Sequence, residues 1–346
     1  MNENQNIKDI LVIGAGSWGT ALSYILSQKG YNIKIWSIEQ SVIEDINNSH
    51  KNSKYTGDLI LPINVCAFGT HDIRNFDGSY KPEIIIFAVP TQYVRNVATN
   101  LCNFLEEHSS KVVSIVNVAK GIEIVTNLRI SQILSEVLPN NINKKIAVLS
   151  GPNISSEIIK KLPSVSTIAS KNIKVNRLLQ EVFSTDYFRV YTNDDLVGVE
   201  LCGALKNIIA IATGISDGLG FGSNSKASLI TRGLYELTKF GVKFGAKPKT
   251  FSGIAGMGDL ITTCISPCSR NRYVGERLAK GEKIDNIIKS MYMIAEGIDT
   301  TKAVYEMSLK FDLELPITEC VYNIIYNDTN VLDSVKSLMT RKFKSE

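Results

Sequence analysis

The residue best suited to proton transfer is Lys206, because it lies within a long apolar run, GVELCGALKNIIAI at 198–211. A lysine inside an apolar helix loses hydration, which disfavours its charged form and lowers its pKa toward the range useful for acid–base catalysis. Two structural alternatives stay open at this point. The side chain extends to solvent, or it pairs with Glu200 on the same run.

Two later segments carry groups suited to binding a small anion. GMGD at 256–259 is typical of a turn that presents a carboxylate, that of Asp259. SRNR at 269–272 begins a predicted helix, where an arginine beside backbone N–H groups and an amide side chain makes a good phosphate receptor. Either segment is also explained as the capped start of a helix. Together they predict a substrate with a phosphate at one end.

The glycine-rich sequence GAGSWG at 14–19 follows an apolar run and opens a helical pattern. In this context Gly14 is expected to make a tight turn, Gly16 to let the backbone approach a pyrophosphate, and Gly19 to let helix and strand pack closely. The helix N-terminus then offers N–H groups to the anion. The motif predicts a nicotinamide dinucleotide site. A flavin site, a nucleoside diphosphate site and a plain glycine turn are the alternatives.

An acidic residue stands where such sites usually bind the adenine ribose. Glu39 lies 20 residues after Gly19, at the end of the second predicted strand. The alternative is a solvated loop carboxylate. The segment WSIEQ at 36–40 holds no arginine to receive a 2′-phosphate, and Glu39 would repel one. NAD(H) is therefore expected to be favoured over NADP(H), by about tenfold or about 1.4 kcal/mol. The alternative is that a more distant cation, such as Lys54 or Arg74, folds over the ribose site.

The elements that must position these residues change character near Tyr191. Before it, short Ile/Val-rich runs alternate with helical patterns, as in a parallel sheet covered by helices. After it, the patterns are longer and helical. With 346 residues, about two domains are expected. We predict an α/β Rossmann-like domain with a mostly parallel sheet at 1–190 and an all-α substrate-binding domain at 191–346. The expected strands are 10–13, 33–36, 83–89, 112–116 and 146–149, and the expected later helices are 194–216, 225–240, 270–280, 284–292, 298–310 and 316–327.

Ligands of open α/β sheets bind beyond the carboxyl ends of the strands. Lys120 and the segment SGPN at 150–153 follow two of the predicted strands. They are therefore candidate ligand contacts, although surface lysines are common.

Composition excludes several other classes. The 38 basic and 34 acidic residues give a net charge of +4, which is no nucleic-acid signature. A polar N-terminus predicts no signal peptide, and the apolar stretch 196–215 holds Glu200 and Lys206, which favours a buried helix over a membrane span. Only Cys264 and Cys268 are close together among six cysteines, with no histidine near them. We expect reduced cytoplasmic thiols and no metal site.

The motifs also match a known family from end to end. The chain resembles the bacterial-type NAD(P)-dependent glycerol-3-phosphate dehydrogenases. The block at 198–233 is the most specific part of the match. The matching segments are GAGSWGTAL (14–22), FAVP (87–90), AKGIE (119–123), LSGPN (149–153) with Glu157, GVELCGALKNIIAIATGISDGLGFGSNSKASLITRG (198–233), GMGDLITTC (256–264), SRNR (269–272), AEG (295–297) and PITE (316–319).

The resemblance implies reversible hydride transfer between the nicotinamide and dihydroxyacetone phosphate, which gives sn-glycerol 3-phosphate for phospholipid synthesis. It implies Lys206 as proton donor and acceptor, with Lys120, Asp259 and Asn207 as its catalytic neighbours. The implied cofactor contacts, beyond the glycines and Glu39, are Ser17, Trp18, Lys120, Ser155, Arg270, Ile294 and Glu296. The implied substrate contacts are Lys120, Gly151, Asn153, Lys206, Asp259, Thr263, Ser269, Arg270 and Asn271.

Two positions depart from the family pattern. Ser155 stands where alanine is usual, and Ser37-Ile38 stand where an arginine is common, which weakens the case for strict use of NADPH. The alternative functions are a related 3-hydroxyacid or 6-phosphogluconate-type dehydrogenase and an NADH-sensing regulatory protein without turnover. We further expect a homodimer.

Overall fold

The computed structural model describes residues 7–69 and 80–342. The chain divides into two compact units. The first comprises Met1–Ala119 with Ile130–Leu196, and the second comprises Lys120–Arg129 with Val197–Glu346. The segment 120–129 thus groups with the helical part of the chain, whereas the sequence placed it in the N-terminal domain. The predicted domain ranges themselves stay a prediction.

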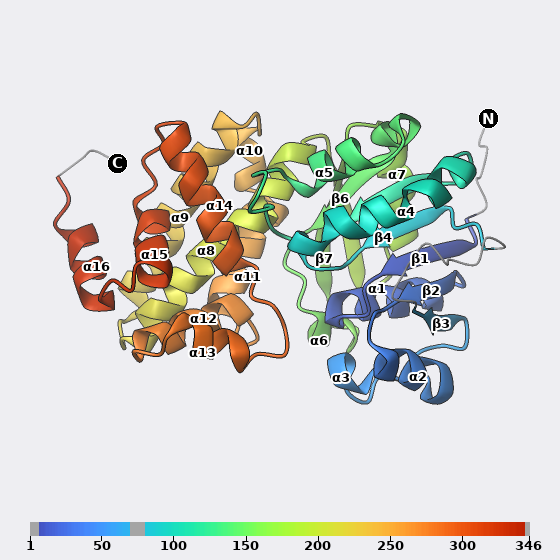
Figure 1. The fold of residues 1–346 in the computed structure, drawn as a ribbon, viewed down its shortest axis with the longest axis horizontal. Coiled ribbons are helices and arrows are strands. Elements are labelled where there is room, and N and C mark those ends of the chain that lie inside the picture. Colours follow the sequence, from blue (N-terminus) through green and yellow to red (C-terminus); the bar gives the residue numbers. More distant parts are fainter. Residues whose placement is uncertain (1–6, 70–79, 343–346) are drawn as a thin grey trace. The chain divides into compact units, whose positions relative to one another are not determined.

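The first unit is built on one sheet whose strands run in the order β3-β2-β1-β4-β5-β6-β7-β8 among the described residues (Figure 1). Every neighbouring pair is parallel except β6 and β7, so the predicted Rossmann-like, mostly parallel sheet is confirmed. The strands are β1 (Asp9–Ile13), β2 (Asn32–Trp36), β3 (Val65–Phe68), β4 (Ile84–Phe87), β5 (Ser114–Asn117), β6 (Ile146–Ser150), β7 (Ser164–Ser170) and β8 (Phe188–Asn193).

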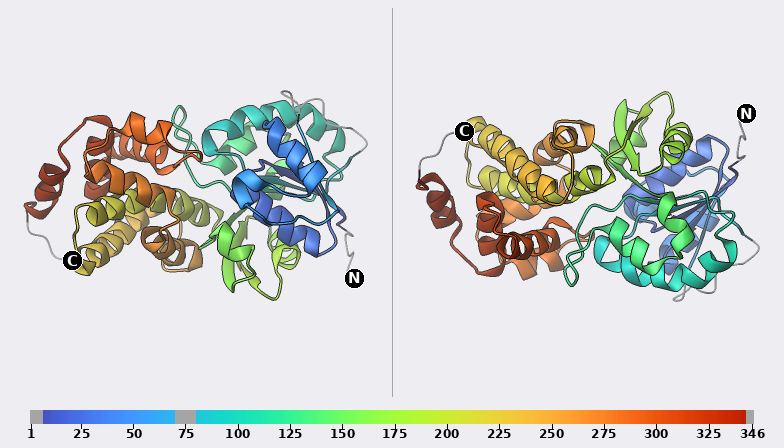
Figure 2. Two further views of the ribbon diagram at one scale, coloured as in Figure 1. Left: turned by 90° about the horizontal axis from the view of Figure 1, so that it is seen from below. Right: turned by 90° about the horizontal axis from the view of Figure 1, so that it is seen from above.

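Helices cover both faces of this sheet. Helix α4 lies on one face, and α1 and α7 lie on the other (Figure 2). Ile10 of β1 pairs with Ile33 of β2 and with Ile84 of β4, and all three side chains are buried, as expected for a sheet covered on both sides. The helices of this unit are α1 (Ser17–Gln28), α2 (Gln40–Ser49), α3 (Ser53–Thr56), α4 (Val94–His108), α5 (Ile130–Val137), α6 (Ser155–Ile158) and α7 (Ile173–Phe183), with short 3₁₀ turns at Thr91–Tyr93 and Asn140–Lys145.

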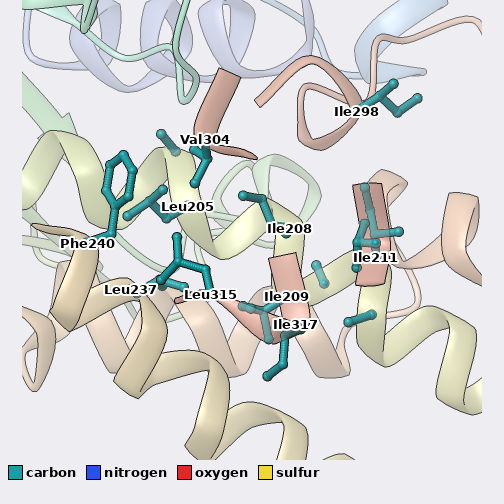
Figure 3. Close-up of a cluster of buried hydrophobic side chains, with 14 of the residues drawn as sticks. Leu205, Ile208, Ile209, Ile211, Leu237, Phe240, Ile298, Val304, Leu315 and Ile317 are labelled. Atoms are coloured by element: carbon teal, nitrogen blue, oxygen red, sulfur yellow. The ribbon is translucent and has the colours of Figure 1, made fainter. Parts of the chain in front are cut away.

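The second unit is helical and is organised around α8 (Leu196–Gly218). Its apolar side chains pack against those of the surrounding helices, for example Ile209 beside Ile317 (Figure 3). Helix α8 is long and apolar enough to cross a membrane, but 94% of its most apolar window is buried inside the structure, as in a core helix. The other helices are α9 (Ser223–Lys243), α10 (Pro248–Phe251), the π-helical segment η4 (Ile254–Gly258), α11 (Asp259–Ile265), α12 (Arg270–Ala279), α13 (Ile284–Lys289), α14 (Gly297–Lys310), α15 (Pro316–Tyr326) and α16 (Val331–Met339).

The segment 120–129 is fixed to this unit at both ends. Ile122 is buried in the apolar core and forms an isolated antiparallel bridge with Arg129. The Arg129 guanidinium lies 2.6 Å from the buried carboxylate of Glu200 on α8. These contacts give the loop that carries Lys120 a defined position in the second unit.

Candidate active site

The centre of the candidate site is a buried lysine–aspartate pair. Lys206 projects from α8, is 6% exposed, and its ammonium contacts the Asp259 carboxylate. It also donates to the Thr263 hydroxyl at 2.6 Å. Asp259 and Thr263 lie one turn apart on α11, and the Thr263 hydroxyl also contacts the Asp259 carbonyl oxygen at 2.7 Å. The expected turn at 256–259 is a π-helical segment that leads directly into α11.

The environment of Lys206 suits acid–base work. Burial lowers its pKa to about 7, and the nearby Lys120 cation acts in the same direction, while Asp259 opposes the shift. The ammonium and the neutral amine forms of Lys206 are then both populated near neutral pH. The two structural alternatives for Lys206 are both wrong. Its side chain does not extend to solvent, and Glu200 pairs with Arg129 instead of with Lys206.

Asp259 also binds a second lysine. The Lys120 ammonium lies 2.6 Å from the other Asp259 carboxylate oxygen. The backbone of Lys120 is held as well, because its N–H donates to Glu296 at 3.1 Å and its carbonyl accepts from the Asn207 amide at 3.1 Å. Two cations therefore flank one buried carboxylate.

A chain of amides continues from this cluster. The Asn271 side chain donates to the Asn207 side-chain oxygen at 2.9 Å, and accepts from the backbone N–H of Gly297 at 2.9 Å. Helix α12, which carries Asn271, approaches α8 closely because glycines face each other. A Cβ on Gly275 would lie 2.1 Å from the Ile211 carbonyl oxygen, so no larger residue fits there.

The start of α12 holds the predicted phosphate contacts. Ser269 caps this helix, its hydroxyl accepting from the Arg272 N–H at 3.3 Å, as the sequence alternative of a capped helix start required. Arg270 is exposed and donates to the Ile294 carbonyl at 2.9 Å. The roles of Ser269, Arg270 and Ile294 in ligand binding stay predictions.

In the first unit, the glycine loop fits a pyrophosphate. Gly14 has a φ of 112°, a conformation that favours glycine, and a Cβ there would lie 2.8 Å from the Ala88 carbonyl oxygen. A Cβ on Gly19 would lie 2.0 Å from the Gly14 carbonyl oxygen, whereas one on Gly16 meets nothing within 4 Å. The loop is thus tight where helix and strand meet and open over the N-terminus of α1, as a dinucleotide requires.

Three candidate cofactor contacts lie in or beside the glycine loop, and each is held by other residues. Trp18 packs edge-on against Phe188, with ring centroids 6.4 Å apart. The Ser17 hydroxyl donates to the Tyr55 carbonyl at 3.0 Å. Glu39 follows β2, as predicted, and contacts two residues of α3: the Tyr55 hydroxyl donates to it at 2.5 Å, and the Lys54 ammonium pairs with it.

The loop after β6 holds three further candidates. Asn153 donates to the Val165 carbonyl at 3.1 Å and accepts from the Ser166 hydroxyl at 3.0 Å, which fixes it against β7. Gly151 packs against the same strand, and Ser155 begins α6. Because β6 runs parallel to β1 through β4 and β5, this loop and the glycine loop lie at the same edge of the sheet. The ligand roles of Gly151, Asn153 and Ser155 stay predictions.

Sequence reasoning missed several residues that support these sites. Arg129 lies outside the conspicuous motifs, and Tyr55 and Asn52 lie in a segment with no motif. Asn52 is buried and donates to the Ala15 carbonyl and to the Thr20 hydroxyl, each at 2.8 Å. One signal was available, because Glu200 inside an apolar helix needs a partner. No group of three or more metal-ligating side chains is found among residues 7–69 and 80–342.

Comparison with known proteins covers nearly the whole chain. Residues 9–176 match the N-terminal part, and residues 195–336 the C-terminal part, of the family described as NAD-dependent glycerol-3-phosphate dehydrogenase. A glycerol-3-phosphate dehydrogenase [NAD(P)+] of Citrifermentans bemidjiense is 44% identical over 341 residues, 97% of this chain and 98% of the relative. One of Bacillus cereus is 42% identical over 337 residues, 97% of each chain.

Solved structures agree. Glycerol-3-phosphate dehydrogenase from Coxiella burnetii superposes with a TM-score of 0.88 at 34% identity, covering 97% of this chain and 99% of that one. The enzyme from Saccharomyces cerevisiae gives a TM-score of 0.78 at 29% identity, covering 96% and 99%.

Proposed function

Because the chain belongs to the NAD-dependent glycerol-3-phosphate dehydrogenase family, we propose that it catalyses reversible hydride transfer between NAD(P)H and dihydroxyacetone phosphate, forming sn-glycerol 3-phosphate. It is an oxidoreductase that uses NAD(H) or NADP(H). The observation that carries the proposed chemistry is the buried cluster of Lys206, Asp259 and Lys120, since a protein that only senses NADH has no need of a proton donor.

Lys206 is the proposed proton donor. The reduced nicotinamide, when bound, supplies the hydride that reduces the ketone carbon. The ketone oxygen gains negative charge, and the Lys206 ammonium gives it a proton, so that ketone, hydride and proton together become the secondary alcohol. The resulting neutral amine recovers its proton from solvent. In the oxidation direction the neutral amine accepts the hydroxyl proton. A placed acid of this kind contributes about 10²- to 10⁴-fold.

The neighbouring side chains orient the reactants. Asp259 holds Lys206 and Lys120 on its two carboxylate oxygens, and Thr263 fixes the Lys206 ammonium. Asn207 and Asn271 form the hydrogen-bonded chain beside them. We assign Arg270 and Ser269, with the first turn of α12, to the substrate phosphate.

The cofactor is assigned to the first unit. The glycines at 14, 16 and 19 would hold the pyrophosphate, and Glu39 the adenine ribose. Ser17, Trp18 and Ser155 are assigned to the cofactor from the resemblance of their motifs to the family, and Lys120, Arg270, Ile294 and Glu296 complete the assigned contacts. Gly151 and Asn153 are assigned to the substrate. Residues 1–190 are proposed to bind the dinucleotide and 191–346 the substrate, in a cytoplasmic homodimer.

The test is oxidation of NADH and NADPH, followed at 340 nm, with dihydroxyacetone phosphate. Parallel reactions contain 6-phosphogluconate with the oxidised cofactors, and a blank contains no ketone. We expect turnover only with the three-carbon phosphate. Cofactor binding without turnover would instead support the sensing alternative, and oxidation of 6-phosphogluconate would support the related dehydrogenase.

A further inference from the structure

Glu39, the carboxylate placed to bind the adenine ribose, has both oxygens engaged. One accepts from the Tyr55 hydroxyl at 2.5 Å, and the other pairs with the Lys54 ammonium. The Glu39 and Lys54 side chains keep 29% and 43% of their surface exposed, so both reach solvent beside the loop. The ribose-binding position therefore carries a cation as well as an anion.

The helix that supplies this cation is tied to the glycine loop. Asn52, which precedes α3, donates to the Ala15 carbonyl and the Thr20 hydroxyl, each at 2.8 Å. The Ser17 hydroxyl donates to the Tyr55 carbonyl at 3.0 Å. Lys54 lies between these two anchored residues, so its backbone has a defined position relative to the pyrophosphate loop.

This pairing removes the repulsion that the sequence predicted. Burial tends to raise the pKa of Glu39, but hydrogen bonds from Lys54 and Tyr55 outweigh it and lower the pKa, so Glu39 is charged at neutral pH. The adjacent Lys54 cation offsets that charge. An incoming 2′-phosphate would then meet a neutral pair with one flexible cationic arm.

We propose that Lys54 is the receptor for the ribose 2′-phosphate of NADP(H), and that the Glu39–Lys54 pair lets one loop take either cofactor. With NAD(H), Glu39 accepts a ribose hydroxyl and Lys54 stays paired. With NADP(H), the exposed Lys54 ammonium, which has three N–H donors, contacts the carboxylate and the phosphate together, and for the phosphate lysine serves as a point charge. The tenfold preference for NADH expected from the sequence should shrink accordingly. This inference rests on the proposed use of nicotinamide dinucleotides.

The test measures cofactor binding in the absence of substrate. NADH and NADPH are titrated against the purified full chain by nucleotide fluorescence, in wild type, Lys54→Met, Glu39→Gln and the control Lys51→Met. Lys51 is a nearby lysine whose ammonium lies 3.9 Å from Asp58, so its replacement matches the change in net charge. Thermal melting checks that each variant is folded.

Lys54→Met is expected to raise the Kd for NADPH about tenfold and leave that for NADH within about twofold. Glu39→Gln should weaken NADH binding and tighten NADPH binding. The loss in Lys54→Met should diminish at high salt. If Lys54→Met and Lys51→Met give the same ratio of NADPH to NADH Kd, the assignment is wrong. Because these titrations contain no ketone, they give the same answer even if dihydroxyacetone phosphate proves not to be the substrate.

Discussion

Replacing Lys206 by methionine separates proton transfer from cofactor binding. Methionine keeps much of the length of the side chain but has no ionisable group. If Lys206 donates the proton, kcat for ketone reduction falls by about 10²- to 10⁴-fold. The Kd for NADH should change by less than about twofold, because Lys206 is not among the residues assigned to the cofactor. Stopped-flow single turnovers would show the loss in the chemical step itself.

The structure also sets the stability cost of this change. Asp259 is 1% exposed and would lose one of its two cations while keeping Lys120. Removing one partner of a buried pair typically costs about 3–5 kcal/mol, and the remaining lysine should keep the loss at the lower end. Urea unfolding of Lys206→Met beside wild type measures this loss directly. A Lys206→Met protein that stays fully folded under the assay conditions and yet has lost turnover identifies a catalytic loss.

The pH dependence of the wild-type enzyme tests in which direction Lys206 transfers the proton. Reduction needs the protonated amine, so kcat/KM for the ketone should fall as pH rises through about 7, while kcat/KM for glycerol 3-phosphate should rise through the same range. The profiles should lose these steps in Lys206→Met. A variant that retains kcat within tenfold of wild type, or a profile with its steps unchanged, would refute the role of Lys206.

Three further changes test the surrounding residues. Arg270→Ala should raise KM for the ketone phosphate by about 10- to 100-fold, as expected for a lost contact worth about 1.5–3 kcal/mol; an equal loss of kcat/KM for unphosphorylated dihydroxyacetone would contradict the phosphate role. Arg129→Met removes this partner of the buried Glu200 carboxylate and loosens the segment that carries Lys120. Because the Lys120 cation lowers the Lys206 pKa, the pH midpoint of kcat/KM should rise, and Arg129→Lys should retain more of the wild-type profile. An unchanged midpoint would rule out this positioning effect. Burial raises the pKa of Glu236 to about 7, although its carboxylate accepts from the N–H groups at the start of α15. The contribution of Glu236 to stability is therefore full below about pH 4.5 and is lost as pH rises through 7. The unfolding free energy of wild type should fall relative to that of Glu236→Gln over this range, and a constant difference between the two proteins would contradict this.

The sequence predicted the sheet well where strands are buried on both faces. The apolar runs beginning at Ile10, Ile33 and Ile146 correspond to β1, β2 and β6. Strands β3, β7 and β8 were missed. The four-residue β3 exposes Cys66, β7 mixes serines into its pattern, and the edge strand β8 alternates buried and exposed positions. Their pairing depends on neighbours distant in the chain rather than on a local apolar run.

In the candidate site, too, some features could be predicted from the sequence and others could not. Burial of Lys206 could be predicted from its apolar helix, and its proximity to Asp259 from the family match. For Glu39 the sequence offered only two distant candidate cations, Lys54 and Arg74, and Arg74 lies outside the described residues. The sequence could not choose Lys54 or predict Tyr55, because both reach Glu39 only when α3 is anchored to the glycine loop. Arg129 and Glu200 are 71 residues apart, and neither periodicity nor spacing specifies such a contact.

The charge of the central cluster connects stability to catalysis. Asp259 carries one negative charge between two lysines, so with Lys206 protonated the cluster has one net positive charge in a buried place. Burial is the main reason why the Lys206 pKa falls to about 7, and the nearby Lys120 cation adds to the shift. An anionic substrate bound nearby would supply the missing negative charge and favour the ammonium form. Lys206 would then be only partly protonated in the free protein, and more fully protonated when a phosphorylated ketone needs its proton.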